Sequence, residues 1–364
     1  MAQFKKIGVL TSGGDAPGMN AAVCAVVNSA AAKGIKTVGL IGGYKGLIEN
    51  NLVDLTHYNP AEIIRHGGTA LYTDRCLEFK TPEGMAKAIE TCKKNNIDAI
   101  VAIGGDGTFR GATDLSSRGI PTIGIPGTID NDITATDYTI GFDTAMNTTV
   151  SLIDNLADTC ESHARCNVIE VMGRNCGEIT LKAGIACGAV ATVIPEVPFD
   201  EVAAIENMKR LKAEGRRGMI VTISEGVFNP DGSKYGETLA KKIEEETGIE
   251  TKFCRPGHIF RGGAPHLRDR YTASIMGNTA IDLLLNGQSD LIIAERDGKI
   301  VPVNIHWALV ADKMYKNKLK DGDLDGFSEA DITAMKELCE KRRQEIKKLY
   351  DIGVALSRAR HFEN

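Results

Sequence analysis

Short apolar runs alternate along the chain with longer segments whose apolar residues recur at helical spacing. The runs are rich in Val, Ile and Ala, which is typical of parallel strands covered on both faces. The alternation predicts an α/β fold with a mostly parallel sheet and helices on both faces. Strands are expected at residues 7–10, 37–41, 97–103, 120–125, 167–171, 191–194, 218–223 and 291–294. Helices are expected to about residue 32 after the first loop, at about 82–95, 144–160, 202–214 and 269–285, and to about 350.

Two of these strands are followed by loops that combine glycines with carboxylates. Residues 104–108 (GGDGT) follow one strand, and residues 126–132 (PGTIDND) follow the next. Parallel strands place both loops at one sheet edge, where open α/β folds bind ligands. Adjacent glycines let backbone N–H groups approach a phosphate, while aspartates can hold a divalent cation or take a proton. The combination indicates phosphoryl transfer, with Asp106 for Mg²⁺ and Asp130 or Asp132 for the acceptor hydroxyl.

An earlier loop, residues 11–20 (TSGGDAPGMN), joins the first strand to an alanine- and valine-rich helix. A strand, glycine turn and helix in this order form an anion site, because the helix N-terminus presents unpaired N–H groups. Neither a GxxxxGK[ST] loop nor a GxGxxG fingerprint is present in it. A tight structural turn is therefore the alternative interpretation of this loop.

Composition narrows the function classes. The chain has 364 residues and a formal net charge of −5, which argues against a surface that coats nucleic acid. No apolar stretch is long enough to span a bilayer, and the N-terminus lacks a signal-peptide core. The nine cysteines include no CxxC pair, so reduced thiols and a cytoplasmic location are expected.

Near the C-terminus, residues 321–326 (DGDLDG) are similar to the start of a calcium loop. The twelfth position is Ile332, where such a loop needs a bidentate Glu. The sequence therefore predicts an ordinary loop, with Ser328 and Asp331 forming a capping-box-like start to the last helix.

Five motifs occur in a specific order: TSGGDAPGMN at 11–20, GGDGT at 104–108, PGTIDND at 126–132, VMGR at 171–174 and GHIFRGG at 257–263. With them, the chain from about residue 7 to 285 resembles the bacterial-type 6-phosphofructokinase family. The resemblance implies two similar three-layer α/β/α domains with mostly parallel sheets and an active site in the cleft between them. We expect a nucleotide-binding domain at 1–140, rejoined by about 256–305, a sugar-phosphate-binding domain at 141–255 and a C-terminal helical extension at 306–364.

The resemblance also implies roles for the residues that match family motifs. Asp130 would be the general base for the 1-hydroxyl of fructose 6-phosphate, with Arg174 and Thr128 beside the transferring group. ATP would be the donor and Mg²⁺ the cofactor, held by Asp106. The nucleotide would be lined by Gly14, Arg75, Cys76, Gly105, Asp106, Gly107 and Thr108. The sugar phosphate would be bound by Thr128, Asp130, Arg165, Met172, Gly173, Arg174, Glu225, Lys252, His258 and Arg261. Arg165 would reach in from a neighbouring subunit of a homotetramer built as a dimer of dimers.

The choice of donor depends on two small residues. In the pyrophosphate-using branch of the family the position of Gly107 is typically Asp and that of Gly127 typically Lys. An Asp side chain at 107 would occupy the space of the nucleotide α-phosphate and repel it, so the two glycines favour ATP. The alternatives are a pyrophosphate-dependent enzyme, a kinase for another substrate such as NAD, and a catalytically silent sugar-phosphate-binding regulatory subunit.

Some positions depart from the family pattern or allow a structural interpretation. Lys252 stands where the family usually has an arginine, and Arg255 nearby could replace it. Asp132 could only brace its loop, Arg75 could be a surface ion pair, and Glu225 could be a buried hydrogen-bond acceptor. The positions where arginines of the effector site are usual carry Cys24, Asn28, His57 and Ala157. Without those cations, we expect little response to ADP or phosphoenolpyruvate.

Overall fold

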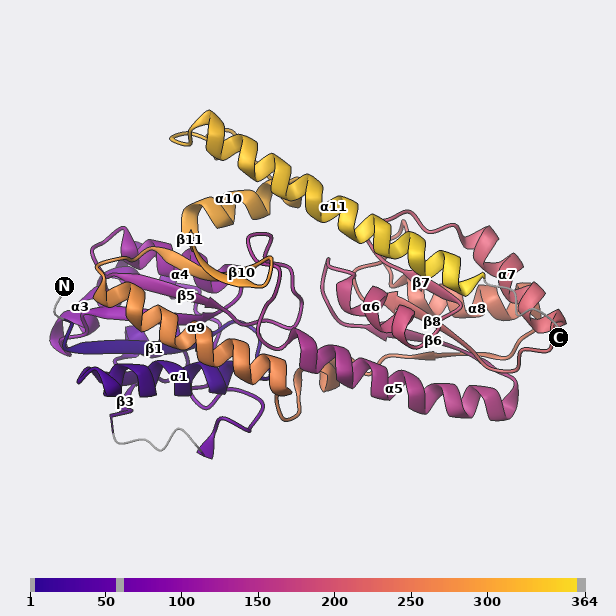
Figure 1. The fold of residues 1–364 in the computed structure, drawn as a ribbon, viewed down its shortest axis with the longest axis horizontal. Coiled ribbons are helices and arrows are strands. Elements are labelled where there is room, and N and C mark those ends of the chain that lie inside the picture. Colours follow the sequence, from indigo (N-terminus) through magenta and orange to yellow (C-terminus); the bar gives the residue numbers. More distant parts are fainter. Residues whose placement is uncertain (1–3, 57–61, 359–364) are drawn as a thin grey trace. The chain divides into compact units, whose positions relative to one another are not determined.

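The computed structural model describes residues 4–56 and 62–358, which form two compact units (Figure 1). Unit 1 comprises Met1–Ile129, Ile133–Thr144 and Arg261–Cys339, and unit 2 comprises Asp130–Asp132, Ala145–Phe260 and Glu340–Asn364. The sequence-based domain limits stay predictions, and these compact units divide the chain at nearby but different positions.

Unit 1 contains a seven-stranded sheet with the strand order β11-β10-β5-β4-β1-β2-β3. Its strands are β1 (Lys6–Ser12), β2 (Lys36–Leu40), β3 (Leu52–Asp54), β4 (Ala99–Gly104), β5 (Thr122–Pro126), β10 (Leu291–Arg296) and β11 (Lys299–Asn304). The inner strands are parallel, whereas β3 and β11 pair antiparallel at the edges. Ser12 is in register with Gly104, and Gly104 with Pro126, so the loops that follow these residues leave the same edge of the sheet, as the sequence predicts.

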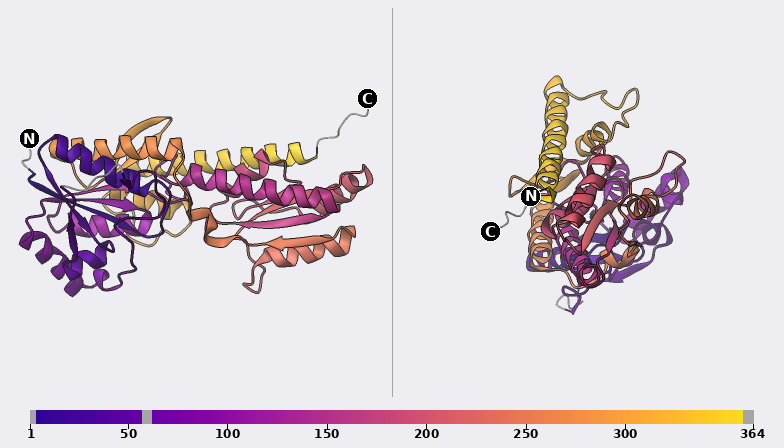
Figure 2. Two further views of the ribbon diagram at one scale, coloured as in Figure 1. Left: turned by 90° about the horizontal axis from the view of Figure 1, so that it is seen from below. Right: turned by 90° about the vertical axis from the view of Figure 1, so that its right-hand side faces the viewer.

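Helices cover both faces of this sheet (Figure 2, left). Helices α1 (Met19–Ala32) and α9 (Leu267–Leu285) pack against each other on one face. The opposite face carries the main apolar core, to which α2 (Tyr44–Glu49), η2 (Glu78–Lys80), α3 (Pro82–Lys94), α4 (Asp106–Ser116) and α10 (Ile305–Tyr315) contribute. Helix α3 begins as predicted, because Pro82 is its first residue and the Thr81 side chain accepts a hydrogen bond from Gly84 N at 3.1 Å.

Unit 2 has a four-stranded, all-parallel sheet with the order β7-β8-β6-β9. The strands are β6 (Cys166–Val171), β7 (Ala191–Val193), β8 (Met219–Ser224) and β9 (Thr251–Cys254). Helices α7 (Glu201–Ala213) and α8 (Tyr235–Thr247) share one apolar core with the sheet, and α5 (Phe142–His163) and α6 (Glu178–Ala186) share another. The three-layer α/β/α architecture with mostly parallel sheets is thereby confirmed.

The last helix that the structure describes is α11 (Glu329–Ser357), which follows α10 in the chain. The short η3 (Gly257–Arg261) precedes α9. The predicted capping box is present: Asp331 N donates to Ser328 Oγ at 3.1 Å, and Ser328 N donates to Asp331 Oδ2 at 3.2 Å. Residues of α11 up to Cys339 belong to unit 1, and those from Glu340 onward belong to unit 2. In the part of the chain that the structure describes, no helix is long and apolar enough to cross a membrane, and the cysteines form no disulfide.

Candidate active site

The predicted site residues fall into two groups, one in each compact unit. Unit 1 holds Gly14, Arg75, Cys76, Gly105, Asp106, Gly107, Thr108, Thr128 and Arg261. Unit 2 holds Asp130, Arg165, Met172, Gly173, Arg174, Glu225, Lys252 and His258. The division follows the predicted roles closely, since all residues expected at the nucleotide lie in unit 1 and most of those expected at the sugar phosphate lie in unit 2.

In unit 1 the first two glycine loops are locked to each other. Thr108 Oγ1 donates to Ser12 O at 3.1 Å, across the ends of β4 and β1. A Cβ atom at Gly104 would lie 2.3 Å from both Ser12 O and Thr108 Oγ1, so only glycine fits there. Gly105 is the N-cap of α4, and no side chain caps this helix. The first amides of α4 are therefore presented at the edge of the sheet, in the arrangement that suits a phosphate.

Asp106 stands at the first position of α4. Its carboxylate makes a bidentate contact with Arg110, at 2.7 Å from Nη2 to Oδ2 and 3.2 Å from Nε to Oδ1. Among the described residues no group of three or more His, Cys, Asp and Glu side chains could hold a metal. A single carboxylate nevertheless suits Mg²⁺, which keeps several waters and is commonly bound through one or two carboxylates and substrate phosphates. Asp106 thus fits a magnesium ion that arrives with a nucleotide.

The loop that follows β1 lies against Arg261. Gly13 has a positive φ of 87°, and its carbonyl accepts a hydrogen bond from Thr73 Oγ1 at 2.5 Å. A Cβ atom at Gly14 would lie 3.4 Å from the Arg261 guanidinium, which is also 4.0 Å from Asp15 Oδ1. Arg261, expected at the sugar phosphate, therefore lies beside the first glycine loop of its own unit.

Asn20 is a residue of this region whose role the sequence does not reveal. Its side chain is buried, donates to His66 O at 3.0 Å and to Gly67 O at 3.2 Å, and accepts from Ala70 N at 2.7 Å. These bonds fix the turn that precedes Arg75. The only signal in the sequence is a polar residue at the apolar start of α1, because its partners lie about fifty residues away.

Gly107 and Gly127 have different surroundings. Apart from its chain neighbours and the backbone of its own helix, no heavy atom of the described residues would lie within 4 Å of a Cβ atom at Gly107. At Gly127 it would lie 3.2 Å from Ile103 Cγ2 and 3.2 Å from Met19 Cγ. The loop after Gly127 is held to a later segment, since Thr128 N donates to Ile140 O at 3.0 Å and Thr139 Oγ1 donates to Thr128 O at 2.6 Å.

In unit 2 the structure brings Asp130 and Arg174 together. Asp130 is 2 % exposed, and its Oδ2 lies 3.1 Å from Arg174 Nε. Arg174 has a positive φ of 53°, which is uncommon for a residue with a side chain. Glu225 holds this conformation, because its Oε1 accepts hydrogen bonds from Gly173 N at 3.0 Å and Arg174 N at 2.8 Å. Glu225 thus acts at least as the hydrogen-bond acceptor that the sequence left open as an alternative.

A second cationic group in unit 2 surrounds Glu250. Arg165 Nε lies 2.7 Å from Glu250 Oε2, and Lys252 Nζ lies 3.0 Å from Glu250 Oε1. Arg255 pairs instead with Glu170 at 2.7 Å and with Glu237 at 3.5 Å. Lys252 and Arg255 are both candidates for the position where the family usually has an arginine. Of the two, Lys252 is the one that shares a partner with Arg165.

The remaining predicted residues occupy varied environments. His258 is exposed in η3 and Met172 is buried. Arg75 is exposed and Cys76 half-buried; the neighbouring Asp74 pairs with Lys45 at 2.6 Å. At the expected effector positions, Cys24 is buried, Asn28 is exposed and Ala157 is half-buried, while His57 lies outside the described residues.

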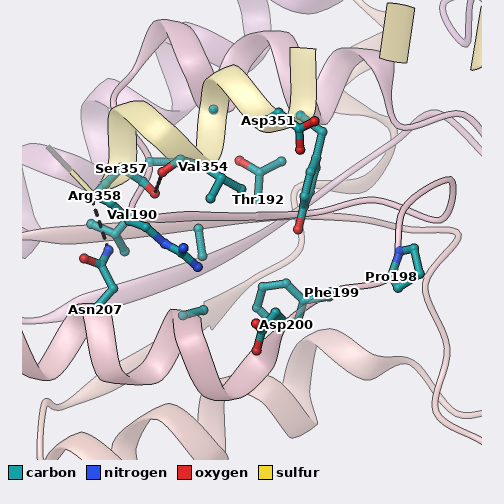
Figure 3. Close-up of a pocket in the computed structure, with 15 residues that line it drawn as sticks. Val190, Thr192, Pro198, Phe199, Asp200, Asn207, Asp351, Val354, Ser357 and Arg358 are labelled. Carbon is teal, nitrogen blue, oxygen red and sulfur yellow. Dashed lines mark hydrogen bonds between the residues drawn. The ribbon is translucent and has the colours of Figure 1, made fainter. Parts of the chain in front are cut away.

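Unit 2 also contains a cavity of about 160 Å³ between the end of α11 and the β7–α7 region (Figure 3). Val190, Thr192 and Val354 contribute to its wall, and Asn207 Nδ2 donates to Ser357 O at 3.1 Å beside it. None of the predicted site residues is among the described residues that line this cavity. It is therefore separate from the candidate catalytic groups.

The chain thus has two α/β units: one carries glycine loops at the edge of its sheet, and the other carries a buried aspartate paired with an exposed arginine. This combination defines the class as an α/β protein with loops suited to phosphate. The chain belongs to the phosphofructokinase family, whose model, described as "Phosphofructokinase", matches residues 6–284. It is 46% identical over 318 residues to an ATP-dependent 6-phosphofructokinase of Clostridium novyi (strain NT), covering 87% of this chain and 98% of the relative. It is 48% identical over 314 residues to an ATP-dependent 6-phosphofructokinase of Clostridioides difficile (strain 630), covering 86% of this chain and 96% of the relative.

Solved structures agree with this assignment. The phosphofructokinase from Saccharomyces cerevisiae has a TM-score of 0.82 and 29% identity, covering 96% of this chain and 50% of that chain. The Pichia pastoris phosphofructokinase in the T-state has a TM-score of 0.83 and 30% identity, covering 98% and 40% respectively. This chain thus spans half or less of those yeast chains. A pyrophosphate-dependent phosphofructokinase from Marinobacter aquaeolei, at 23% identity and a TM-score of 0.71, shares the fold.

Proposed function

We propose that this chain transfers the terminal phosphoryl group of ATP to the 1-hydroxyl of D-fructose 6-phosphate, with Mg²⁺, and releases ADP and fructose 1,6-bisphosphate in glycolysis. The observation that carries the proposal is the buried Asp130 carboxylate, which lies 3.1 Å from Arg174 and within the motif at residues 126–132. Relatives at 46–48% identity that span nearly the same length are named as ATP-dependent 6-phosphofructokinases.

In this proposal Asp130 orients the 1-hydroxyl and accepts its proton as the oxygen attacks the γ-phosphorus of ATP. Burial keeps the carboxylate in one position, and general bases of this kind contribute about 10²–10⁴ to the rate. Arg174 and Thr128 offset the negative charge on the phosphoryl oxygens during transfer. The proton moves from the sugar hydroxyl to Asp130, and the bridging oxygen leaves with ADP.

The donor is bound by unit 1 residues. The backbone N–H groups of Gly105, Asp106 and Gly107 donate hydrogen bonds to the phosphates, Thr108 lines the same site, and Gly14, Arg75 and Cys76 line the rest of the nucleotide. Asp106 holds Mg²⁺, which supplies charge neutralisation on the phosphates when it is bound. Arg110 pairs with the same carboxylate, so a cation bound at Asp106 would compete with this guanidinium.

The acceptor is bound by Met172, Gly173, Arg174 and Glu225, and its 6-phosphate by the cations Arg165, Lys252, His258 and Arg261. Both Arg165 and Lys252 pair with Glu250, so a phosphate has to compete with that carboxylate. We propose that the protein acts in the cytoplasm as a homotetramer, a dimer of dimers, in which Arg165 serves a neighbouring subunit.

The test is a coupled assay of purified protein with fructose 6-phosphate and Mg²⁺, comparing ATP with pyrophosphate. We expect activity with ATP and none with pyrophosphate. Asp130→Asn should lower kcat by about 10²–10⁴-fold, whereas the matched Asp132→Asn should cost less, because we assign Asp132 to bracing the loop. Activity with pyrophosphate alone would refute ATP as the phosphoryl donor. An unchanged kcat in Asp130→Asn would refute Asp130 as the general base.

A further inference from the structure

A buried polar network within unit 2 surrounds the residue that follows Asp130. Arg342, from α11, donates from Nη2 to Asn131 O at 2.7 Å and to Glu178 Oε1 at 3.1 Å. Asn131 donates from Nδ2 to Glu178 Oε2 at 3.0 Å. All three side chains are buried. The loop that carries the proposed base is thus bonded both to the start of α6 and to the last helix of the chain.

Asn131 needs such support because its backbone is left-handed, with φ at 49°. Asparagine tolerates this region better than most residues, yet the conformation persists only where surrounding contacts fix it. The hydrogen bond from Arg342 holds the peptide group between Asn131 and Asp132. Asp130 is the residue before Asn131, so the direction of its side chain depends on the backbone conformation that this hydrogen bond fixes at Asn131.

The charges of the network are balanced. Lys182 lies 2.9 Å from Glu178 Oε2, on the carboxylate that Arg342 also contacts. Burial alone would raise the pKa of Glu178, but Arg342 and Lys182 outweigh it and the pKa is lowered. The carboxylate is therefore ionised at neutral pH, and the buried guanidinium has a counter-charge. A network satisfied in this way is rigid and tolerates little displacement of any member.

We propose that Arg342 is a positioning residue for phosphoryl transfer, which acts through Asn131 to hold Asp130 in place. The inference rests on the proposed function. It assigns a catalytic task to a residue of α11, outside residues 6–284 that the family model matches and in a segment to which the sequence attached no role. The C-terminal helix α11 would then help to position the general base, in addition to packing against the rest of the protein.

The main variant is Arg342→Met, which keeps the length of the aliphatic stem and removes the guanidinium. We expect kcat with ATP and fructose 6-phosphate to fall about 10- to 100-fold, as for small misplacements of a reacting group. The KM for each substrate should change less than about twofold, since the binding residues remain. Arg342→Lys, which retains the charge and one donor, should recover part of kcat. Hydrogen exchange of the peptide that contains residues 126–133 should accelerate in Arg342→Met.

The matched control is Arg343→Met, which removes the neighbouring guanidinium from the exposed face of the same helix. It should leave kcat and the exchange of residues 126–133 unchanged. If Arg342→Met does not fold, Arg342→Lys and Glu178→Gln take its place, and their combination should be non-additive in kcat because both act on one network.

A wild-type kcat in Arg342→Met would overturn the inference, as would a loss confined to KM or one that matches the fraction of unfolded protein in circular dichroism. So would unchanged hydrogen exchange of residues 126–133. Failure of the proposed function is a separate result: the unmodified protein would then be inactive with ATP and fructose 6-phosphate, while hydrogen exchange would still report whether Arg342 holds the loop.

Discussion

At the scale of single residues, the two glycines that favour ATP act through different physics. Gly107 opens onto space with no described heavy atom within 4 Å of an added Cβ, so its small size leaves room for a ligand. Gly127 is packed at 3.2 Å against Ile103 and Met19, so its small size serves the core. The same residue type therefore has a ligand role at one position and a packing role at the other.

This contrast predicts opposite effects of substitution. Gly107→Asp should leave the melting temperature unchanged or slightly raised, because an acid suits the first turn of α4. It should lower kcat/KM for ATP at least about tenfold, through repulsion of the phosphate by a nearby like charge. Gly127→Ala should destabilise the fold by about 1–3 kcal/mol through overpacking, with a smaller effect on the choice of donor.

Thermal unfolding and assays with ATP and pyrophosphate check both variants. If Gly107→Asp lost stability without a change in kcat/KM for ATP, the space beside Gly107 would not be the place where the donor binds. A fully stable Gly127→Ala would show that Met19 and Ile103 can move aside at no cost.

The place of the motif residues in the fold can be predicted from the sequence, but the residues that hold them cannot. Asp106 and Asp130 follow strands whose apolar pattern is clear, so their place at a sheet edge can be predicted. Arg342 and Asn20 cannot be identified in this way, because they bond backbone groups that are 211 and about fifty residues away. Nothing local in a sequence indicates which distant carbonyl a side chain will reach.

At the scale of elements, the buried inner strands can be predicted from the sequence, whereas the edge strands cannot. Strands buried on both faces, such as β4 and β8, are mostly apolar and were predicted to within about two residues. The edge strands β3 and β11 are partly exposed and mixed in composition, so they carry no such pattern. They pair antiparallel, which a continuous alternation of strand and helix does not anticipate.

The start of α6 offers a prediction about acid stability. The lowered pKa of Glu178 means that the unfolded chain takes up this proton at a higher pH than the folded chain. The contribution of Glu178 to folding stability is therefore complete above about pH 4.3, which is the pKa of Glu in an unfolded chain. It is lost as the pH falls through the pKa of the folded state. We expect the unfolding free energy to fall by up to about 1.4 kcal/mol per pH unit from this group in that range.

Urea denaturation of the wild type and of Glu178→Gln between pH 5 and the acid limit measures this contribution. The variant should be less stable at neutral pH and should lose stability less steeply on acidification. Parallel curves for the two proteins would show that Glu178 binds its proton equally in the folded and unfolded states.

At the scale of the whole molecule, each compact unit carries its own part of the proposed chemistry. Unit 1 has the glycine loops and Asp106, and unit 2 has Asp130, Arg174 and the cations at Glu250. The chain passes between the units at residues 129–133, 144–145 and 260–261, and again within α11. The loop that bears Asp130 is thus itself one of the crossings, which is consistent with the support that we propose for it from Arg342.

The residues at the expected effector positions depart from the family pattern, which bears on regulation. Cys24 on α1 is buried at 1 % exposure, so the position where an effector arginine is usual does not present a side chain to solvent. Burial also raises the pKa of the Cys24 thiol to about 12, so it remains neutral. Asn28 is exposed but uncharged. Anionic effectors need fixed cations for charge-assisted hydrogen bonds, and these positions supply none.

We therefore expect ADP and phosphoenolpyruvate to shift the half-saturating concentration of fructose 6-phosphate less than about twofold, since an effector can only shift an equilibrium by its differential affinity. Steady-state saturation curves with and without each effector, at saturating ATP and fixed Mg²⁺, measure the shift. Asn28→Arg restores one cation at an exposed position, and a larger response in that variant would support the charge argument. A strong response of the unmodified protein to low concentrations of either effector would mean that the cations come from residues other than those four positions.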